Sequence, residues 1–157
     1  MLRTQISLLG IIFLVVFIEA VVVPGIWSSL RVDLIIGMII GIIIHLEFSQ
    51  GLFFVMIVSL LLQAFSGARP GLVPLVYLGA FLVLELLKGL VYLENVFTQV
   101  LLAAAIFALA SGAVVLSMDL TFTHVEIIPL AIGAMLTGLA SPAMVALVER
   151  LKKAYEA

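Results

Sequence analysis

The sequence predicts an all-α integral membrane protein, a compact bundle of about six transmembrane helices. Of the 157 residues, 66% are hydrophobic and only 10% are charged, whereas a soluble domain is roughly 45–50% apolar and about 25% charged. The apolar runs, such as residues 101–116, lack the alternation of apolar and polar residues that strands of a membrane barrel require. Because hydrocarbon offers no partner to backbone N–H and C=O groups, we expect helices to be the spanning units.

Composition and motifs also limit the chemistry. The chain has no cysteine and a formal net charge of −2, which excludes disulfides and thiolate metal sites and argues against binding to nucleic acid. The sequence contains no glycine-rich phosphate loop, no G-x-S-x-G elbow and no H-E-x-x-H helix. We therefore predict that the protein is not an enzyme and that it needs no cofactor and no metal.

Six apolar segments follow one another in a single transmembrane domain over residues 1–157. The first resembles a signal peptide, but we predict a retained span because it lacks a convincing cleavage site. The second is shorter than the roughly 20 residues needed to cross a bilayer, so we expect it to extend back to residue 30, with Arg31 reaching the headgroups. The predicted spans are 5–23, 30–46, 51–65, 72–88, 96–118 and 127–148, followed by a short cytoplasmic tail over residues 149–157.

The distribution of positive charge predicts the orientation of the chain. Six spans place both ends on one side of the membrane, and the cytoplasmic side normally carries more lysine and arginine. We therefore predict an inner-membrane protein with both termini in the cytoplasm and with the turn over residues 63–74 on the external side. The terminal side carries Arg3, Lys88, Arg150, Lys152 and Lys153, and the opposite side carries Arg31 and Arg69.

Small residues at four-residue spacing predict close helix packing, since they let helix backbones approach each other in lipid. Gly37 and Gly41 form such a pair on the second segment, and the alternative is that their register is accidental. A longer ridge on the fifth segment consists of Ala104, Ala108 and Gly112.

Charges within the apolar segments need a partner, because a charge at the centre of a spanning helix costs roughly 2.5–3.5 kcal/mol on insertion scales. Glu85 and Lys88 are three residues apart and share a helix face, so we predict an intramembrane ion pair near the cytoplasmic end. Glu19 has no local partner. It is expected either to face Arg31 or Arg69 inside the bundle or to lie close enough to the surface to be hydrated.

The order of short motifs resembles that of the bacterial rod shape-determining protein MreD family. The second span opens with Leu30-Arg31-Val32-Asp33-Leu34, where the family tends to have R-P-D-L. The third ends in Gln63-Ala64-Phe65-Ser66-Gly67, where D-x-x-S-G is common. A turn at Arg69-Pro70-Gly71 and a tyrosine, Tyr77, follow. Val32 and Gln63 depart from the family pattern, so an essential carboxylate at position 63 is not expected.

This resemblance implies a non-enzymatic scaffold of the cell-elongation (rod) complex, which supports lateral peptidoglycan synthesis and cell shape. It implies a bitopic MreC-like partner and indirect links to MreB, RodA and a class B penicillin-binding protein. It also implies a fold similar to the S-component of energy-coupling-factor transporters. The candidate residues for partner binding or for shaping the outer surface are Arg31, Asp33, Gln63, Ser66, Gly67, Arg69 and Gly71.

Two alternative functions stay open at this point. The first is an S-component-like substrate-binding subunit of a vitamin transporter, which would need several polar groups that converge on an enclosed pocket. The second is a membrane enzyme that acts on lipid-linked intermediates, although the sequence shows no paired acids or metal-ligand motif for it. Ligand-induced thermal stabilisation would support the first, and turnover of such lipids would support the second.

Overall fold

The computed structural model describes residues 2–22, 31–66, 69–117 and 127–156. Within these ranges the protein is all-α and contains six helices. The first continues directly into a π-helical turn, η1, over Ile18–Val22. The helices are α1 (Leu2–Phe17), α3 (Leu34–His45), α4 (Phe48–Ser66), α5 (Leu72–Leu87), α6 (Val96–Ser117) and α7 (Ile127–Glu156).

Three of these helices are long and apolar enough to cross a membrane. They are α4, the 96–116 part of α6 and the 127–154 part of α7. Exposed leucine, isoleucine and phenylalanine side chains cover the outer faces of the helices; examples are Leu75, Leu86, Phe97, Leu109 and Ile127. In water such a surface would be unfavourable, whereas in lipid it is the expected exterior. The chain is therefore a multi-pass membrane protein.

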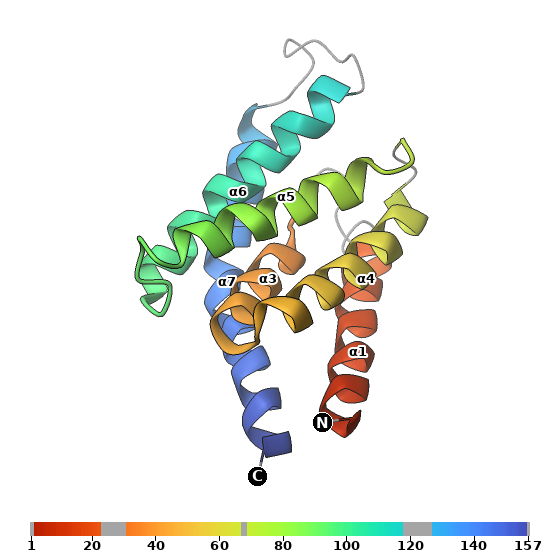
Figure 1. The fold of residues 1–157 in the computed structure, drawn as a ribbon. Helices are drawn as coiled ribbons and strands as arrows, with labels where there is room; N and C mark the ends of the chain where they lie inside the picture. The colour runs from red at the N-terminus through yellow and green to blue at the C-terminus, as the bar shows by residue number, and fades with distance from the viewer. Residues whose placement is uncertain (1, 23–30, 67–68, 118–126, 157) are drawn as a thin grey trace.

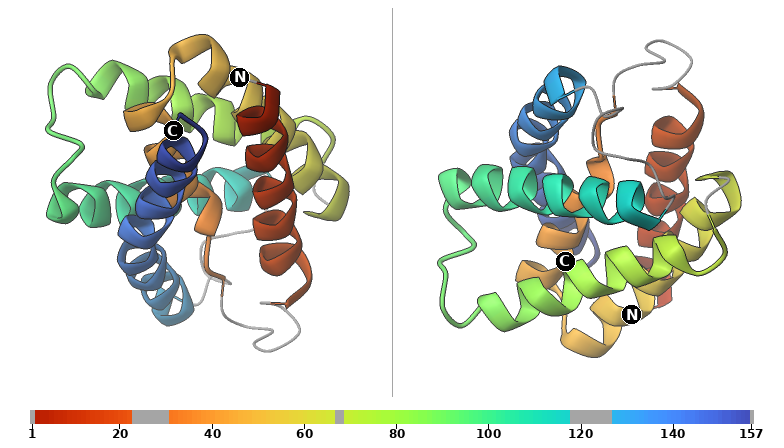
Figure 2. Two further views of the ribbon diagram at one scale, coloured as in Figure 1. Left: turned by 90° about the horizontal axis from the view of Figure 1, so that it is seen from below. Right: turned by 90° about the horizontal axis from the view of Figure 1, so that it is seen from above.

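Helix α3 lies at the centre of the molecule, with α7 on one side and α1 on the other (Figure 2). It contacts α1, α4, α5, α6 and α7. Residues 35–43 of α3 are all buried, as expected for a helix that is apolar on every face. Its 12 residues give a length of only about 18 Å. It is thus a core helix shielded from lipid.

The beginning of α3 differs from the sequence prediction. The helix begins at Leu34 and does not extend back over residues 31–33. Asp33 has extended backbone angles, and its Oδ1 accepts a hydrogen bond from the Ile36 N–H at 3.2 Å. This is the geometry of an N-cap, which satisfies one of the unpaired N–H groups at a helix start. The N-cap at Asp33 therefore fixes the start of the helix at Leu34.

The two glycines of α3 lie against α7. A Cβ atom added at Gly37 would lie 2.7 Å from the Ser141 Cα, and one at Gly41 would lie 3.1 Å from the Val145 Cα. Both obstacles are backbone atoms, which cannot move aside as a flexible side chain can. Glycine thus sets the distance between α3 and α7.

Helices α6 and α7 also pack closely, but only one member of the predicted α6 ridge takes part. Ala104 faces Gly138 of α7, where an added Cβ would lie 3.4 Å from the Ala104 Cβ and 2.8 Å from the Val100 carbonyl oxygen. Ala108 is exposed, and a Cβ at Gly112 would meet nothing within 4 Å. In the described part of the chain, the predicted ridge on α6 therefore packs at Ala104 alone.

Helix α7 continues through Pro142, which lies in its interior. Proline has no N–H, so the carbonyl of Gly138, four residues earlier, loses its helical donor. The Ser141 hydroxyl donates to that carbonyl at 2.8 Å. This local bond supplies the partner that an apolar environment would not. It explains how α7 passes a proline without ending.

The first and last helices bring both ends of the chain to the same end of the molecule (Figure 1). Helix α1 begins there and α7 ends there, at the lower edge of the view. The predicted tail over residues 149–157 is helical as far as Glu156, as a continuation of α7. At about 1.5 Å per residue, the 30 residues of α7 are about 45 Å long, so the helix extends beyond a hydrocarbon core of about 30 Å.

Candidate functional site

A cluster of polar side chains joins four segments of the chain at the N-terminal end of α3. Its members are Glu19 of η1, Asp33 at the start of α3, Tyr77 of α5 and Thr137 of α7. Asp33 and Thr137 are buried, and Glu19 and Tyr77 are half-buried. Polar groups removed from water are stable when they are hydrogen bonded to each other, and the cluster meets this condition.

Asp33 is the centre of this cluster. Its backbone N–H donates to the Thr137 hydroxyl oxygen at 2.9 Å, and its Oδ2 accepts a hydrogen bond from the Tyr77 hydroxyl. Its other carboxyl oxygen caps α3 through Ile36. One residue thereby fixes α5 and α7 to the beginning of the core helix.

Glu19 acts on the same helix end from outside the helix. Its Oε2 accepts hydrogen bonds from the Leu34 N–H at 3.0 Å and from the Ile35 N–H at 3.3 Å. The start of a helix carries a partial positive charge, which favours a nearby carboxyl group. The partner of Glu19 is thus the backbone of α3, and neither of the two arginines considered from the sequence is among its described partners.

Arg31 lies next to this cluster in the sequence, and no described contact connects its side chain to the cluster. The side chain is exposed. Its carbonyl oxygen lies against α7, where a Cβ at Gly133 would come within 2.4 Å of it. Glycine at position 133 therefore lets the segment before α3 approach α7.

The turn between α4 and α5 contains the other candidate residues for an outer surface. Gln63 Oε1 accepts a hydrogen bond from the Val73 N–H at 3.2 Å, and the Ser66 hydroxyl donates to the Gln63 carbonyl at 3.3 Å. Arg69 is exposed, and its carbonyl accepts from the Leu72 N–H at 3.1 Å. Gly67 lies outside the described residues.

Gly71 gives this turn its shape. Its φ angle is +86°, a left-handed conformation that residues with a Cβ rarely adopt. Gly71 precedes α5, and its carbonyl accepts from the Leu75 N–H at 3.1 Å. Gln63 thus caps a helix that Gly71 starts, and the two residues together connect α4 to α5.

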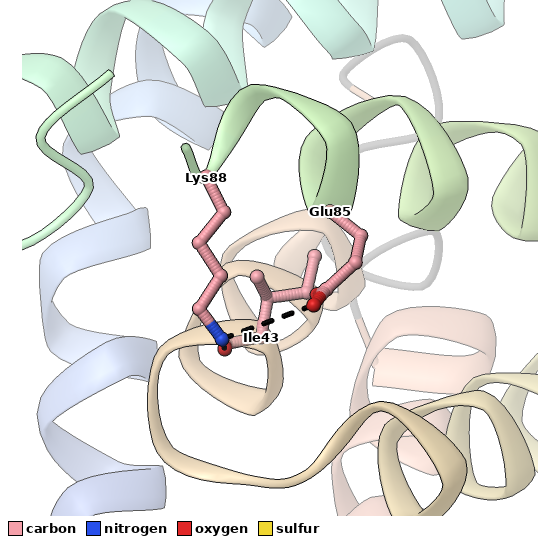
Figure 3. Close-up of polar contacts among 3 residues, drawn as sticks. All are labelled: Ile43, Glu85 and Lys88. Carbon is pink, nitrogen blue, oxygen red and sulfur yellow. Dashed lines mark hydrogen bonds and ion pairs between the residues drawn. The ribbon is translucent and has the colours of Figure 1, made fainter. Parts of the chain in front are cut away.

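At the opposite end of α3, Lys88 and Glu85 extend from α5 towards Ile43 (Figure 3). Lys88 Nζ lies 3.9 Å from Glu85 Oε1 and donates to the Ile43 carbonyl at 2.6 Å. A cation at the C-terminal end of a helix satisfies a free carbonyl and interacts favourably with the helix dipole. The shorter contact is the one with Ile43, so Lys88 mainly serves as a cap for α3.

The exposed end of α7 carries a second ion pair, between Glu149 and Lys153. The hydrogen bond from Lys153 and its charge lower the pKa of Glu149. In the loop before α6, a hydrogen bond to Glu94 and the negative charge of Glu94 raise the pKa of Tyr92. Glu149 follows the predicted span 127–148 and Tyr92 lies in the loop before α6, so both effects describe surface charge.

Sequence reasoning identified several of these residues without their connections. It selected Asp33 and Tyr77 from motifs but did not predict their contact, and it left Glu19 with open alternatives. Thr137 was not selected at all. An acid directly before an apolar run is a signal for a helix N-cap, and that signal alone would have predicted the role of Asp33.

Fold and cluster together define a multi-pass α-helical membrane protein with a central short helix capped at both ends by side chains from its neighbours. Among the described residues, no group of three His, Asp or Glu side chains is arranged to hold a metal ion. Comparison of the chain with known proteins finds no matching protein-family model, no matching curated protein and no matching solved structure.

Proposed function

We propose that this protein is a non-enzymatic scaffold of the bacterial cell-elongation complex, of the kind that its resemblance to MreD implies. In this role it binds an MreC-like bitopic partner in the inner membrane and supports lateral peptidoglycan synthesis. Its links to MreB, RodA and a class B penicillin-binding protein are indirect. Both termini lie in the cytoplasm, and the fold is similar to that of an S-component.

The observation that carries this proposal is the hydrogen bond between Tyr77 and Asp33. These two residues belong to separate motifs of the resemblance, 44 positions apart. Independent matches of short motifs have no reason to meet in space, whereas motifs that build one common structure do. The contact therefore supports the interpretation that the two motifs are parts of one common structure.

Gln63 supports the same proposal at the position where the chain departs from the family. Its amide oxygen accepts a hydrogen bond from the Val73 N–H, and a carboxylate can accept the same bond. Accepting the hydrogen bond from the Val73 N–H therefore does not require a negative charge at position 63. Glutamine at position 63 is thus compatible with membership of a family in which an acid is common at this position.

The partner-binding surface is the outward turn that contains Arg69 and Gly71. The Arg69 side chain is exposed, and the left-handed backbone of Gly71 leads the chain into α5. The partner's single helix packs on a lipid-facing side of the bundle, and its periplasmic part meets this turn. This arrangement requires no nucleophile.

Co-purification tests the proposal. The tagged full-length protein is extracted from bacterial membranes in mild detergent, with and without prior crosslinking, and the associated proteins are identified by mass spectrometry. We expect an MreC-like bitopic protein, and its consistent absence under both conditions would overturn the proposal. Stabilisation of the purified protein by a vitamin would instead favour the transporter alternative.

An arginine pair provides the matched control. Arg69→Gln removes an exposed positive charge from the turn, and Arg150→Gln removes one from the exposed end of α7. We expect the first to reduce the amount of partner recovered at least several-fold and the second to leave it unchanged. Equal amounts of both variants in the membrane fraction would show that insertion is intact.

A further inference from the structure

One face of α5 connects the outward turn, which the proposed function assigns to the partner, with the core of the molecule. Residues three and four positions apart lie on the same face of a helix. On this face of α5 two large side chains, Phe81 and Leu84, are completely buried. The full set along the face, at spacings of three or four residues, is Val73, Tyr77, Phe81, Leu84 and Lys88.

A polar contact with α3 lies near each end of this face. The Tyr77 hydroxyl donates to Asp33, where α3 begins, and Lys88 donates to the Ile43 carbonyl, near the end of α3. With a rise of about 1.5 Å per residue, the two contacts are about 16 Å apart along α5 and about 15 Å apart along α3. The two helices contact each other, so α5 lies along α3 and is bonded to it near both ends.

The Tyr77 contact is the one close to the outward turn. Helix α5 begins at Leu72, so Tyr77 lies about 8 Å and Lys88 about 24 Å along the helix from its start. At this start the Val73 N–H donates to the side chain of Gln63, in the last turn of α4. The end of α4, the turn and the first part of α5 are therefore joined to each other before they are joined to α3.

Asp33 is held in place by contacts that do not involve α5. Its backbone N–H donates to the Thr137 hydroxyl oxygen of α7 at 2.9 Å, and its Oδ1 accepts from the Ile36 N–H at 3.2 Å. Apolar packing is non-directional, whereas a hydrogen bond requires a defined distance and angle. The bond from Tyr77 to Asp33 therefore fixes where α5 lies along α3, which apolar packing at Phe81 alone does not.

We propose that the hydrogen bond between Tyr77 and Asp33 positions the outward turn for its partner. The two residues are positioning residues: they act through the α4–α5 pair and do not contact the partner. The inference rests on the proposed function for the nature of the partner. The position of the turn, however, is a property of this chain and is measured without any partner.

The first experiment measures that position. Because the chain has no cysteine, spin labels can be attached at Ala64→Cys, in the last turn of α4, and at Ala143→Cys, in α7. Both alanines are exposed. Pulsed electron paramagnetic resonance on the labelled full-length protein in detergent gives the distribution of distances between the labels. We expect Tyr77→Phe to shift the maximum of this distribution or to widen it.

Lys88→Met is the matched control, because it also removes one hydrogen bond between α5 and α3, but at the end far from the turn. We expect it to leave the distance distribution as in the unchanged protein. Phenylalanine fills the space of the tyrosine ring, so Tyr77→Phe should fold. An unchanged distribution in Tyr77→Phe, or an equal change in Lys88→Met, would overturn the proposal.

The second experiment adds the partner. At equal amounts in the membrane fraction, we expect Tyr77→Phe to recover several-fold less of the bitopic partner than the unchanged protein, and Lys88→Met to recover the same amount. Equal recovery by Tyr77→Phe and the unchanged protein would overturn the proposal. If the unchanged protein recovers no partner while the labels move as expected, the scaffold function fails and the positioning of the turn by Tyr77 stands.

Discussion

The hydroxyl group of Tyr77 in α5 donates a hydrogen bond to Oδ2 of Asp33, the residue that caps α3. This bond links the second and fourth apolar segments at the place where the core helix begins. Asp33 is buried and Tyr77 is half-buried, and the Tyr77 hydroxyl supplies the described donor to Oδ2 of Asp33, while the Ile36 N–H supplies the donor to Oδ1. The relationship makes Tyr77 a structural residue of the bundle.

Tyr77→Phe removes this donor and leaves Asp33 with one fewer partner. We expect the free energy of unfolding to fall by about 1–2 kcal/mol, as measured for buried hydrogen bonds to charged groups and for bonds between membrane helices. Thermal unfolding in detergent measures the effect. Tyr92→Phe is the matched control: Tyr92 is exposed and donates to Glu94 at 2.9 Å, so its loss should cost less than about 0.5 kcal/mol. Equal effects of the two changes would contradict this role for Tyr77.

Gly37→Ala tests the contact between α3 and α7. The new Cβ would lie 2.7 Å from the Ser141 Cα, so one of the two helix backbones has to shift. We expect a loss of about 1–3 kcal/mol, as is usual for overpacking in a core. Chemical or thermal unfolding of the purified variant in detergent provides the measurement.

Gly112→Ala is the control for this change, because it places the same methyl group on another helical glycine. No atom lies within 4 Å of a Cβ at that position, and alanine has the higher helix propensity. We expect Gly112→Ala to be neutral or to stabilise the protein by up to about 1 kcal/mol. Destabilisation by Gly112→Ala of the same size as by Gly37→Ala would show that the methyl group acts through something other than the α3–α7 distance.

Variants of Lys88 and Glu85 distinguish two roles of the Lys88 charge, which are to cap α3 and to form an ion pair with Glu85. If Lys88 mainly caps α3, Lys88→Met should cost about 1–2 kcal/mol because the Ile43 carbonyl loses a charged donor. Glu85→Gln should then change stability by less than about 0.5 kcal/mol, since Lys88 and Glu85 are 3.9 Å apart and the Lys88 side chain is 42% exposed. Similar losses in both variants would instead favour the ion pair as the main interaction.

The helices of this protein could be predicted from the sequence because each depends on its own composition. The predicted fifth span, residues 96–118, begins at the same residue as α6 and covers all of its described residues, Val96–Ser117. Prediction was less accurate for α3, where the expected span of residues 30–46 became a helix that begins at Leu34. The rule that a span needs about 20 residues assumes a helix that faces lipid, and α3 is enclosed by its neighbours.

The polar cluster could not be predicted in the same way. Its hydrogen bonds connect residues 15, 44 and 104 positions apart, so they depend on which helices lie side by side. Periodicity and composition describe one segment at a time and contain no information on that order. Glu19 shows the consequence: the sequence identified an acid without a partner, and its partner proved to be the backbone of another helix.

A last prediction concerns the exposed end of α7, where the ion pair between Lys153 and Glu149 makes stability depend on pH. The hydrogen bond and charge of Lys153 lower the pKa of Glu149. A carboxyl group with a lowered pKa in the folded state contributes stability that is complete at neutral pH and is lost as pH falls through that pKa. Lys153→Gln should raise the pKa of Glu149 towards its ordinary value, and high salt should do so in part. Carbon-detected NMR titration of the glutamate carboxyl groups measures both shifts.

Arg150→Gln provides the control, because Arg150 also lowers the pKa of Glu149 but contributes less than Lys153. We expect the smaller shift in this variant. A larger shift in Arg150→Gln than in Lys153→Gln would show that the hydrogen bond from Lys153 is not the main cause of the lowered pKa.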